Sequence, residues 1–310
     1  MPVPRSSSTR RPSVTVRVPG TTANLGPGFD TLGIALRLYN RVRVEPNSDK
    51  TINIRSTIAD DARAGATAML GEAANGFFKR ARWANHGFDI WLEGDVPIAR
   101  GLGSSVTARL GCVAALNALA GGPLNRQALF EVVSELEGHP DNAAPAVFGG
   151  FTAATVVEGR ARAVRFSVKP NVQFVTLIPN FEVSTPAARK LVPLQFSKAD
   201  TVHCLTRVAF ITAAFAAGRT DQLRGCFDDR IHQPYREALI PQLSGVIRAG
   251  EKAGAIGGWL SGSGSTIICM TVDKAPAVAR AMLGALPDSR VEILSADTRG
   301  ATVGKVSAAR

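Results

Sequence analysis

The chain has 310 residues, of which 45% are hydrophobic and 20% charged, a composition typical of a globular protein with about two domains. No run of about 18 apolar residues occurs, so the sequence excludes a membrane-spanning helix. The formal net charge is +11, but the basic residues are spread along the chain without interleaved aromatics, which indicates an anion-tolerant surface and argues against a nucleic-acid groove.

The amino terminus and the cysteines exclude further classes. Residues 1–13 are rich in Arg and Ser and lack an apolar h-region, so we expect a basic disordered tail and no secretory signal. The four cysteines stand far apart with no C-x-x-C pair, which argues against a zinc site or a disulfide framework. Buried thiols in a reducing cytoplasm are the simpler interpretation, and we expect a cytoplasmic protein.

Strand and helix patterns alternate along the first half of the chain. Alternating apolar residues predict strands at 14–18, 39–45, 51–54 and 88–92, and a helical pattern covers 61–83. Residues 21–33 contain too much Gly, Pro and Asn for regular structure, so we expect an inward-packed loop that presents Asn24 and Asp30. A purely structural loop, whose Asn and Asp make side-chain turns, is an equally good interpretation.

A glycine-serine loop at 97–108 runs directly into an apolar helix that ends near Leu119. Gly101 and Gly103 permit positive φ and close approach of a ligand, and the first amides of the helix favour an anion such as phosphate. Ser104 and Ser105 add hydroxyls that can cap the helix or reach a phosphate oxygen or its Mg²⁺. No Lys follows the second glycine, so this is not a Walker motif, and a plain Ser-capped helix is the competing interpretation.

The next helix is predicted from the N-cap Asn125 to Gly138, and acids, a His and an Asn gather at its end. A carboxylate in this stretch suits Mg²⁺, and Asn142 can hydrogen-bond a substrate hydroxyl. His139 and Asp141 have the residue types of an acid/base pair. The alternative is a helix-end charge and a cap.

The second half repeats the alternation. A strand at 151–157 and a turn at 158–160 close the first unit; then come a strand at 172–178, a helix start at 184–189, helices at 199–217 and around 241–247, a glycine-rich stretch at 257–266, a strand at 267–270, a helix at 275–286 and a strand at 290–294. This order predicts a two-layer α+β domain. We therefore divide the chain into the tail at 1–13, an amino-terminal domain at 14–165 and a carboxyl-terminal domain at 166–310.

Three glycine-containing loops, at 21–33, 97–108 and 261–266, resemble in order and separation the signature motifs of the GHMP kinases. The blocks at 23–33, 99–105, 137–145 and 231–236 are most similar to the members that act on homoserine, and the resemblance covers residue 14 to the end. It implies an α+β, two-domain fold, with an N-terminal domain like ribosomal protein S5 domain 2 and a ferredoxin-like C-terminal domain.

The resemblance also implies an activity. It is the ATP- and Mg²⁺-dependent phosphorylation of L-homoserine to O-phospho-L-homoserine, for threonine biosynthesis, by a cytoplasmic homodimer that binds neither nucleic acid nor membrane. Two alternatives stay open: another small-molecule kinase of the family or a non-catalytic paralogue, and an RNA-binding protein. Asp30 with two arginines suits a zwitterion better than mevalonate or a sugar, and no aromatic RNA-binding motif is present.

Carried over by position, the resemblance assigns residues to roles. Nucleotide binding falls to Pro97, Arg100, Gly101, Leu102, Gly103, Ser104, Ser105, Val106 and Thr107; Mg²⁺ to Ser105 and Glu137; the substrate pocket to Asn24, Asp30, Asn142, Thr185, Arg189, Arg236 and Gly262; and catalysis to Asn142, Glu137 and Ser105. Phosphoryl transfer passes through a loose transition state, so no strong general base is needed. We therefore expect Asn142, whose amide takes up no proton at neutral pH, to orient the hydroxyl, with no base catalysis by Asp141 or His139.

Some positions depart from the family pattern. Val106 and Thr107 follow the two serines where smaller residues are more common, and Ser265 stands where the third motif usually has Pro. Arg109 lies one turn into the predicted helix. Val106 and Thr107 lie near the expected nucleotide and mark where the chain can differ from its relatives.

Overall fold

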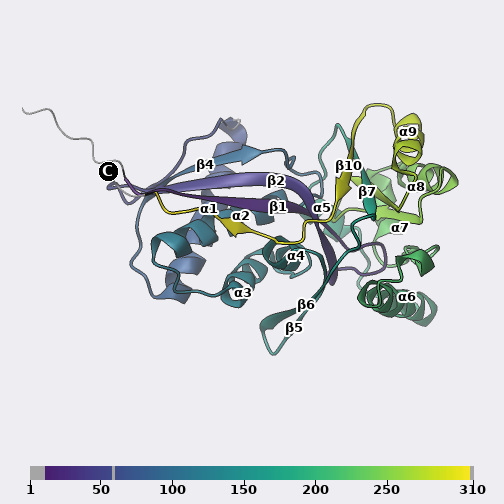
Figure 1. Ribbon diagram of the computed structural model, residues 1–310, viewed down its shortest axis with the longest axis horizontal. Coiled ribbons are helices and arrows are strands. Elements are labelled where there is room, and N and C mark those ends of the chain that lie inside the picture. Colours follow the sequence, from purple (N-terminus) through teal and green to yellow (C-terminus); the bar gives the residue numbers. More distant parts are fainter. Residues whose placement is uncertain (1–10, 58–59, 308–310) are drawn as a thin grey trace, which may run out of the picture.

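The computed structural model describes residues 11–57 and 60–307, which form two lobes, each built on its own sheet (Figure 1). Residues 1–10 of the predicted tail lie outside the described residues. The first lobe contains β1 (Val14–Ala23), β2 (Leu32–Pro46), β3 (Ile52–Ile54), α1 (Asp60–Ala81), β4 (Phe88–Gly94), α2 (Ser104–Leu119), α3 (Arg126–Glu137), α4 (Ala143–Phe148), β5 (Phe151–Val157) and β6 (Arg160–Phe166).

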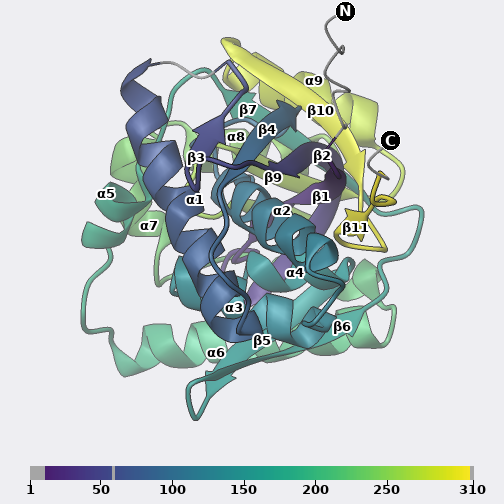
Figure 2. The same ribbon diagram turned by 90° about the vertical axis from the view of Figure 1, so that its left-hand side faces the viewer.

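The larger sheet has the strand order β11-β1-β2-β4-β3, and β2 also pairs with β5, which pairs with β6. Helices α1 to α4 cover one face of it (Figure 2). The alternation in β1 explains this layer, because Val14, Val16 and Val18 point into a core that α2 fills with Leu110, Val113 and other apolar side chains. A glycine-serine loop leads from β4 to α2, at the end of the sheet that faces the second lobe.

The second lobe contains β7 (Gln173–Pro179), α5 (Thr185–Lys190), α6 (Lys198–Ala216), η1 (Thr220–Gln222), α7 (Gln233–Arg236), η2 (Glu237–Leu239), α8 (Leu243–Lys252), β8 (Gly257–Leu260), β9 (Ile267–Thr271), α9 (Ala275–Ala285) and β10 (Ser289–Ser295). Its four strands are antiparallel in the order β10-β7-β9-β8. Strands in the order fourth, first, third, second, with helices after the first and third, are the ferredoxin-like arrangement that was predicted.

The chain then returns to the first lobe. Strand β11 (Thr302–Val303) pairs with β1, and Ser13 forms a bridge with Ser307. The division at residue 165 stays a prediction, but the last strand belongs to the larger sheet.

Within the described residues no helix combines the length and hydropathy needed to cross a bilayer. All four cysteines are free. Cys112, Cys204 and Cys269 are buried as expected, whereas Cys226 is only half-buried.

Several local expectations were wrong. Strand β1 extends to Ala23 and β2 starts at Leu32, so the irregular loop is shorter than predicted. Strand β3, predicted at 51–54, pairs with β4 in parallel. Helix α4 and strand β6 were missed, as was β8 inside the glycine-rich stretch. Gly257 is required in that strand because a Cβ there would lie 2.4 Å from the ring of Phe227.

Candidate active site

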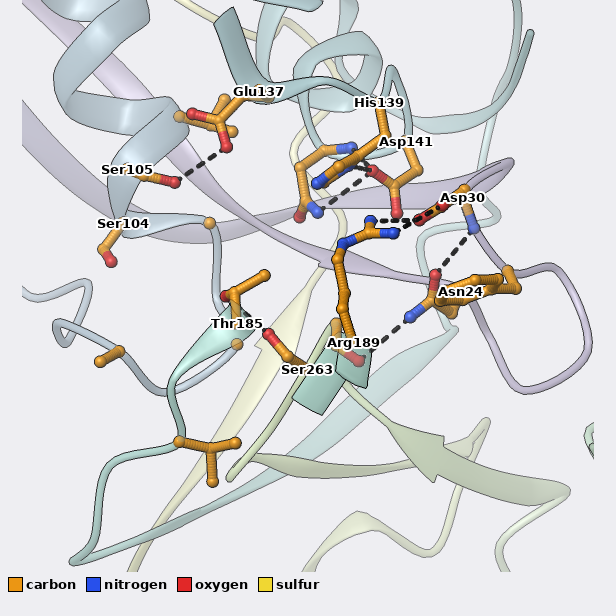
Figure 3. Close-up of a pocket in the computed structure, with 18 of the residues that line it drawn as sticks. Asn24, Asp30, Ser104, Ser105, Glu137, His139, Asp141, Thr185, Arg189 and Ser263 are labelled. Carbon is orange, nitrogen blue, oxygen red and sulfur yellow. Dashed lines mark hydrogen bonds and ion pairs between the residues drawn. The ribbon is translucent and has the colours of Figure 1, made fainter. Parts of the chain in front are cut away.

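A pocket lies between the two lobes, bordered by the loop before α2, the segment after α3, the loop between β1 and β2, and α5 (Figure 3). Its empty volume, counted out to the open mouth, is about 610 Å³. Figure 3 shows two groups of polar side chains in it. Ser104, Ser105 and Glu137 form one end, and the other end holds Asp30, Asp141, Arg189 and their neighbours.

The loop before α2 leaves the helix start open. Gly103 occupies the N-cap position with φ 71°, and no side chain caps the helix, so the Ser-capped interpretation was wrong. The hydroxyls of Ser104 and Ser105 face the pocket instead (Figure 3). Uncapped amides at a helix start, together with the helix dipole, attract an anion.

Gly101 has a second reason to be glycine. A Cβ at this position would lie 2.1 Å from the carbonyl oxygen of Ser261, and its φ of 75° also disfavours a side chain. The hydroxyl of Ser261 donates to the carbonyl of Gly101 at 2.7 Å, and the amide of Thr266 donates to the carbonyl of Arg100. The loop of the first lobe therefore docks directly on the glycine-rich loop of the second.

Glu137, the last residue of α3, receives two donors from α2. The Ser105 hydroxyl donates to its Oε2 at 3.1 Å, and Nη1 of Arg109 lies 2.7 Å from its Oε1. Gly138, with φ 80°, then ends the helix as predicted. The sequence placed Ser105 and Glu137 together, but the pairing with Arg109 was missed, although Ser105 and Arg109 have the i, i+4 spacing of one helix face.

Asp30 and Arg189 form a bidentate ion pair at the other end of the pocket, with distances of 2.6 and 3.0 Å. This hydrogen bonding raises the pKa of Arg189. Phe29 lies beneath both arginines, its ring centre 5.4 Å from the Arg189 guanidinium and 5.1 Å from that of Arg236. The guanidinium groups of Arg189 and Arg236 thus both lie over the Phe29 ring, and Asp30 binds the first of them.

Arg236 is only 2% exposed, and its burial, with the nearby charge of Arg189, lowers its pKa to about 10, so it stays cationic at neutral pH. Its Nη1 donates to the carbonyl of Gly262 at 2.9 Å and lies 3.1 Å from Nδ1 of His232. The other nitrogen of His232 donates to the carbonyl of Gly26. His232 supports this arginine from behind, a role that the sequence did not indicate.

Both polar atoms of the Asn24 side chain form hydrogen bonds with the protein backbone. Its Oδ1 accepts from the amide of Asp30 at 3.1 Å, and its Nδ2 donates to the carbonyl of Gly262 at 3.0 Å. The acceptor is six residues from its donor, so this bond closes the loop and is not a side-chain turn of two residues. Asn24 also links the two lobes through Gly262.

Asn142 is held from two sides. The Thr21 hydroxyl donates to its Oδ1 at 2.7 Å, and its Nδ2 lies 3.3 Å from Oδ1 of Asp141. Nδ1 of His139 is 2.5 Å from the same Asp141 oxygen. Burial acts to lower the pKa of His139, but the hydrogen bond and charge of Asp141 outweigh it, so the net pKa is raised. Asp141 thus contacts both His139 and Asn142 through one carboxylate oxygen.

Comparison with known proteins gives the family. Residues 68–150 match the GHMP kinases N terminal domain, and residues 211–288 match the GHMP kinases C terminal family. The homoserine kinase of Deinococcus radiodurans is 41% identical over 263 residues, which cover 85% of each chain. The homoserine kinase of Clostridium botulinum is 36% identical over 299 residues, 94% of this chain and 99% of that one. The chain belongs to the GHMP kinase family.

Solved structures agree with this assignment. The crystal structure of homoserine kinase from Cytophaga hutchinsonii has a TM-score of 0.86 and 27% identity, with 98% of this chain and 100% of that chain covered. The mevalonate kinase of Methanococcus jannaschii has a TM-score of 0.66 at 14% identity and therefore shares the fold. The two-domain α+β architecture expected for a GHMP kinase is confirmed.

Four of the nucleotide residues predicted for this GHMP kinase lie away from the pocket. Leu102 is fully buried in the core, and the Thr107 hydroxyl is used by Asn40 and by the carbonyl of Ser104. Pro97 and Arg100 line a neighbouring hollow, where Arg100 donates to the carbonyl of Pro179. The other loop residues border the pocket, as do all seven predicted substrate residues.

Two groups in the pocket have donors that suit a metal ion. The Ser105 hydroxyl and the Glu137 carboxylate supply hard oxygen ligands, which Mg²⁺ prefers, beside the open helix start. Asp30, His139 and Asp141 also bring ligand atoms within 4.8 Å of one another. Arg189 binds Asp30 and His139 binds Asp141 in this second group, just as Arg109 binds Glu137 in the first. The position beside the open helix start, where phosphate would bind, therefore favours the first group for Mg²⁺.

Proposed function

We propose that this GHMP kinase transfers the γ-phosphoryl group of ATP to the side-chain hydroxyl of L-homoserine, giving ADP and O-phospho-L-homoserine. The alcohol loses its O–H proton to solvent, a new O–P bond forms, and the bond from the γ-phosphorus to the β,γ-bridging oxygen breaks. The observation that carries the proposal is one pocket that joins an anion-binding helix start to a carboxylate and two arginines. The relatives named homoserine kinase support the same substrate.

The triphosphate would lie along the loop from Gly101 to Val106, where free amides and two hydroxyls border the pocket. Ser105 and Glu137 would hold Mg²⁺, which neutralises phosphate charge when bound. These residues already lie within hydrogen-bond distance of each other. The protein thus contributes a preorganised set of donors at the nucleotide end.

The amino-acid end suits a zwitterion. Asp30 would take the substrate ammonium, and Arg189 with Arg236 would hold its carboxylate, because a guanidinium binds a carboxylate through two parallel hydrogen bonds. Thr185 and Gly262 border the same space, and Asn24 holds the loop that carries Asp30. Mevalonate lacks the ammonium, and an uncharged sugar lacks both charges, so neither offers the same matches.

Asn142 would orient the accepting hydroxyl between the two ends. Thr21 and Asp141 fix its side-chain amide in one orientation. The amide would therefore offer its remaining hydrogen bond to the substrate hydroxyl without first changing rotamer. The proton of the alcohol leaves late in a loose transition state, so the reaction needs a correctly oriented hydroxyl and no strong general base. Asp141 and His139 support this amide as a pair.

The experiment that tests the proposal measures ADP release from ATP and Mg²⁺ with L-homoserine, D-homoserine, L-serine, L-threonine and mevalonate in parallel. We expect the highest kcat/KM with L-homoserine, and a phosphomonoester on its side-chain oxygen by ³¹P NMR. A higher kcat/KM with any other acceptor would refute the substrate. Salt-sensitive RNA retention with no ADP release would favour the RNA-binding alternative.

Two further parts of the proposal come from the resemblance alone. They are a homodimer and a cytoplasmic location. Size-exclusion chromatography with light scattering tests the first, since a mass equal to one chain would refute it. Fractionation of cells that produce the full chain tests the second, and recovery of the protein outside the cytoplasmic fraction would refute it.

A further inference from the structure

Arg109 contacts the carboxylate that the proposed function assigns to Mg²⁺. Its Nη1 lies 2.7 Å from Oε1 of Glu137, and its Nη2 lies 3.5 Å from Oε2 of Glu72. The side chains of Arg109 and Glu137 are 15% and 9% exposed, so the pair is largely removed from water. Nε of Arg109 is buried without a hydrogen-bond partner in the described part of the chain.

Three helices create this contact. Ser105 and Arg109 are one turn apart on α2, so both point toward Glu137 at the end of α3. Glu72 comes from α1, which packs on α2, and its side chain is 64% exposed. Arg109 therefore bridges a shielded carboxylate at the nucleotide end of the pocket and an exposed carboxylate on α1.

The contact has an electrostatic consequence. A metal ion on Glu137 and the guanidinium at its present place would repel each other, because both are cations a few ångströms apart, and a divalent ion doubles the repulsion of a single charge. Glu72 offers the guanidinium another anionic partner, which it already touches.

We propose that Arg109 is a resident counter-cation of Glu137 that the metal ion displaces, and that Glu72 accepts the displaced guanidinium. The inference rests on the proposed role of Glu137 as a metal ligand. Before the metal binds, Arg109 holds the carboxylate beside Ser105. Arg109 is thus a positioning residue that sets how much divalent metal the protein requires.

The test measures the affinity of the full chain for Mn²⁺ in the presence of ADP, by the electron paramagnetic resonance of the free ion. We expect Arg109→Gln to bind Mn²⁺ roughly threefold to tenfold more tightly, because the competing charge is gone. Glu72→Gln should bind it more weakly by a similar factor, because the displaced guanidinium loses its partner. In the Arg109→Gln background, Glu72→Gln should change nothing.

The double variant separates displacement from a general field effect. If Glu72→Gln weakens Mn²⁺ binding equally with and without Arg109, its charge acts directly on the metal and the inference is overturned. Unchanged or weaker Mn²⁺ binding in Arg109→Gln overturns it too.

Arg80→Gln is the matched control, since Arg80 joins α1 to α3 through Glu131, and it should leave Mn²⁺ affinity unchanged. Arg109→Lys, which keeps the charge, should bind Mn²⁺ more weakly than Arg109→Gln.

Glu137→Gln distinguishes this inference from the proposed function. If that variant keeps full Mn²⁺ affinity, the metal assignment is wrong and the inference falls with it. If it loses Mn²⁺ while Arg109→Gln gains no affinity, only the role of Arg109 is refuted. The acceptor specificity of ADP release in the unmodified chain tests the homoserine assignment independently of either result.

Discussion

Asp30 and Arg189 lie 159 residues apart in the chain, yet they bind each other through two hydrogen bonds in the pocket between the lobes. Their charges cancel where we propose that a zwitterion binds. An amino acid offers the same two partners in exchange, an ammonium for Asp30 and a carboxylate for Arg189. The ion pair therefore keeps both groups in place without leaving either charge unpaired.

Arg189→Lys should raise the KM for L-homoserine by about tenfold to a hundredfold, since one charge-assisted hydrogen bond contributes about 1.5–3 kcal/mol. The nucleotide contacts are unaffected, so the KM for ATP should change little. Steady-state kinetics with each substrate varied in turn measures both. Arg219→Lys is the control, because Arg219 pairs with Asp221 at the exposed surface. An unchanged KM for L-homoserine in Arg189→Lys would contradict the pocket assignment.

Asn142→Ala should lower kcat by about a hundredfold, because the accepting hydroxyl loses the group that orients it. His139→Asn should keep most of the activity, since Thr21 and Asp141 still hold the amide. Single-turnover measurements with saturating ATP and L-homoserine compare the two variants. A His139→Asn protein with activity near background would instead make His139 the base.

Gly101→Ala should destabilise the protein by about 2 kcal/mol or more, because its Cβ would meet a backbone carbonyl at a positive φ. Gly65→Ala is the opposite case, since Gly65 lies in α1 with open space around it, and it should stabilise by about 0.5–1 kcal/mol. Urea denaturation of both variants measures the two changes. Equal effects would show that the contact between the two loops is absent in solution.

The stability of the protein should fall between pH 6.5 and pH 4 because of His232. Burial, reinforced by the charge of Arg236, lowers its pKa from 6.5 to about 4, so the unfolded chain binds a proton that the folded protein excludes. The contribution is complete above pH 6.5 and is lost as pH falls through 4, a change of roughly 3 kcal/mol. His139, whose pKa is raised, acts in the opposite sense and only above pH 6.5.

Denaturation curves at a series of pH values check this dependence. His232→Gln should remove most of the slope between pH 6.5 and pH 4, and His139→Asn should leave it. A His232→Gln protein that keeps the full slope would assign it to other groups. Since Gln can still donate to Gly26, the variant can retain one of the two hydrogen bonds of the imidazole.

Features encoded in neighbouring residues were predictable from the sequence. Helix α3 has the predicted bounds because Asn125 accepts from the amide of Ala128 and Gly138 adopts a left-handed conformation, both of which are local effects. The order of glycine-rich loops likewise indicated the family and the pocket. The open start of α2 was predicted only as one of two possibilities, because a serine at a helix start also suits a cap.

Features that depend on distant residues were not predictable. The close approach of Gly101 to Ser261 joins loops 160 residues apart, so no local pattern shows why this glycine is required. The cluster of Arg109 with Glu72 and Glu137 needs three helices in register. Leu102 in the loop and Thr107 in the first turn of α2 lie among residues that line the pocket, and only packing decides that these two side chains are buried.

The pairing of β11 with β1 makes the described chain almost a closed ring. Ser13 and Ser307 lie side by side, with their hydroxyls 2.8 Å apart, so the second lobe is in effect an insertion tethered to the first by two strands of chain. A continuous hydrophobic core also joins the lobes, because Leu36 and Phe151 of the first pack in one buried cluster with Phe174 and Trp259 of the second. The two chain connections and this shared core together fix Arg189 and Arg236 in position opposite Asp30.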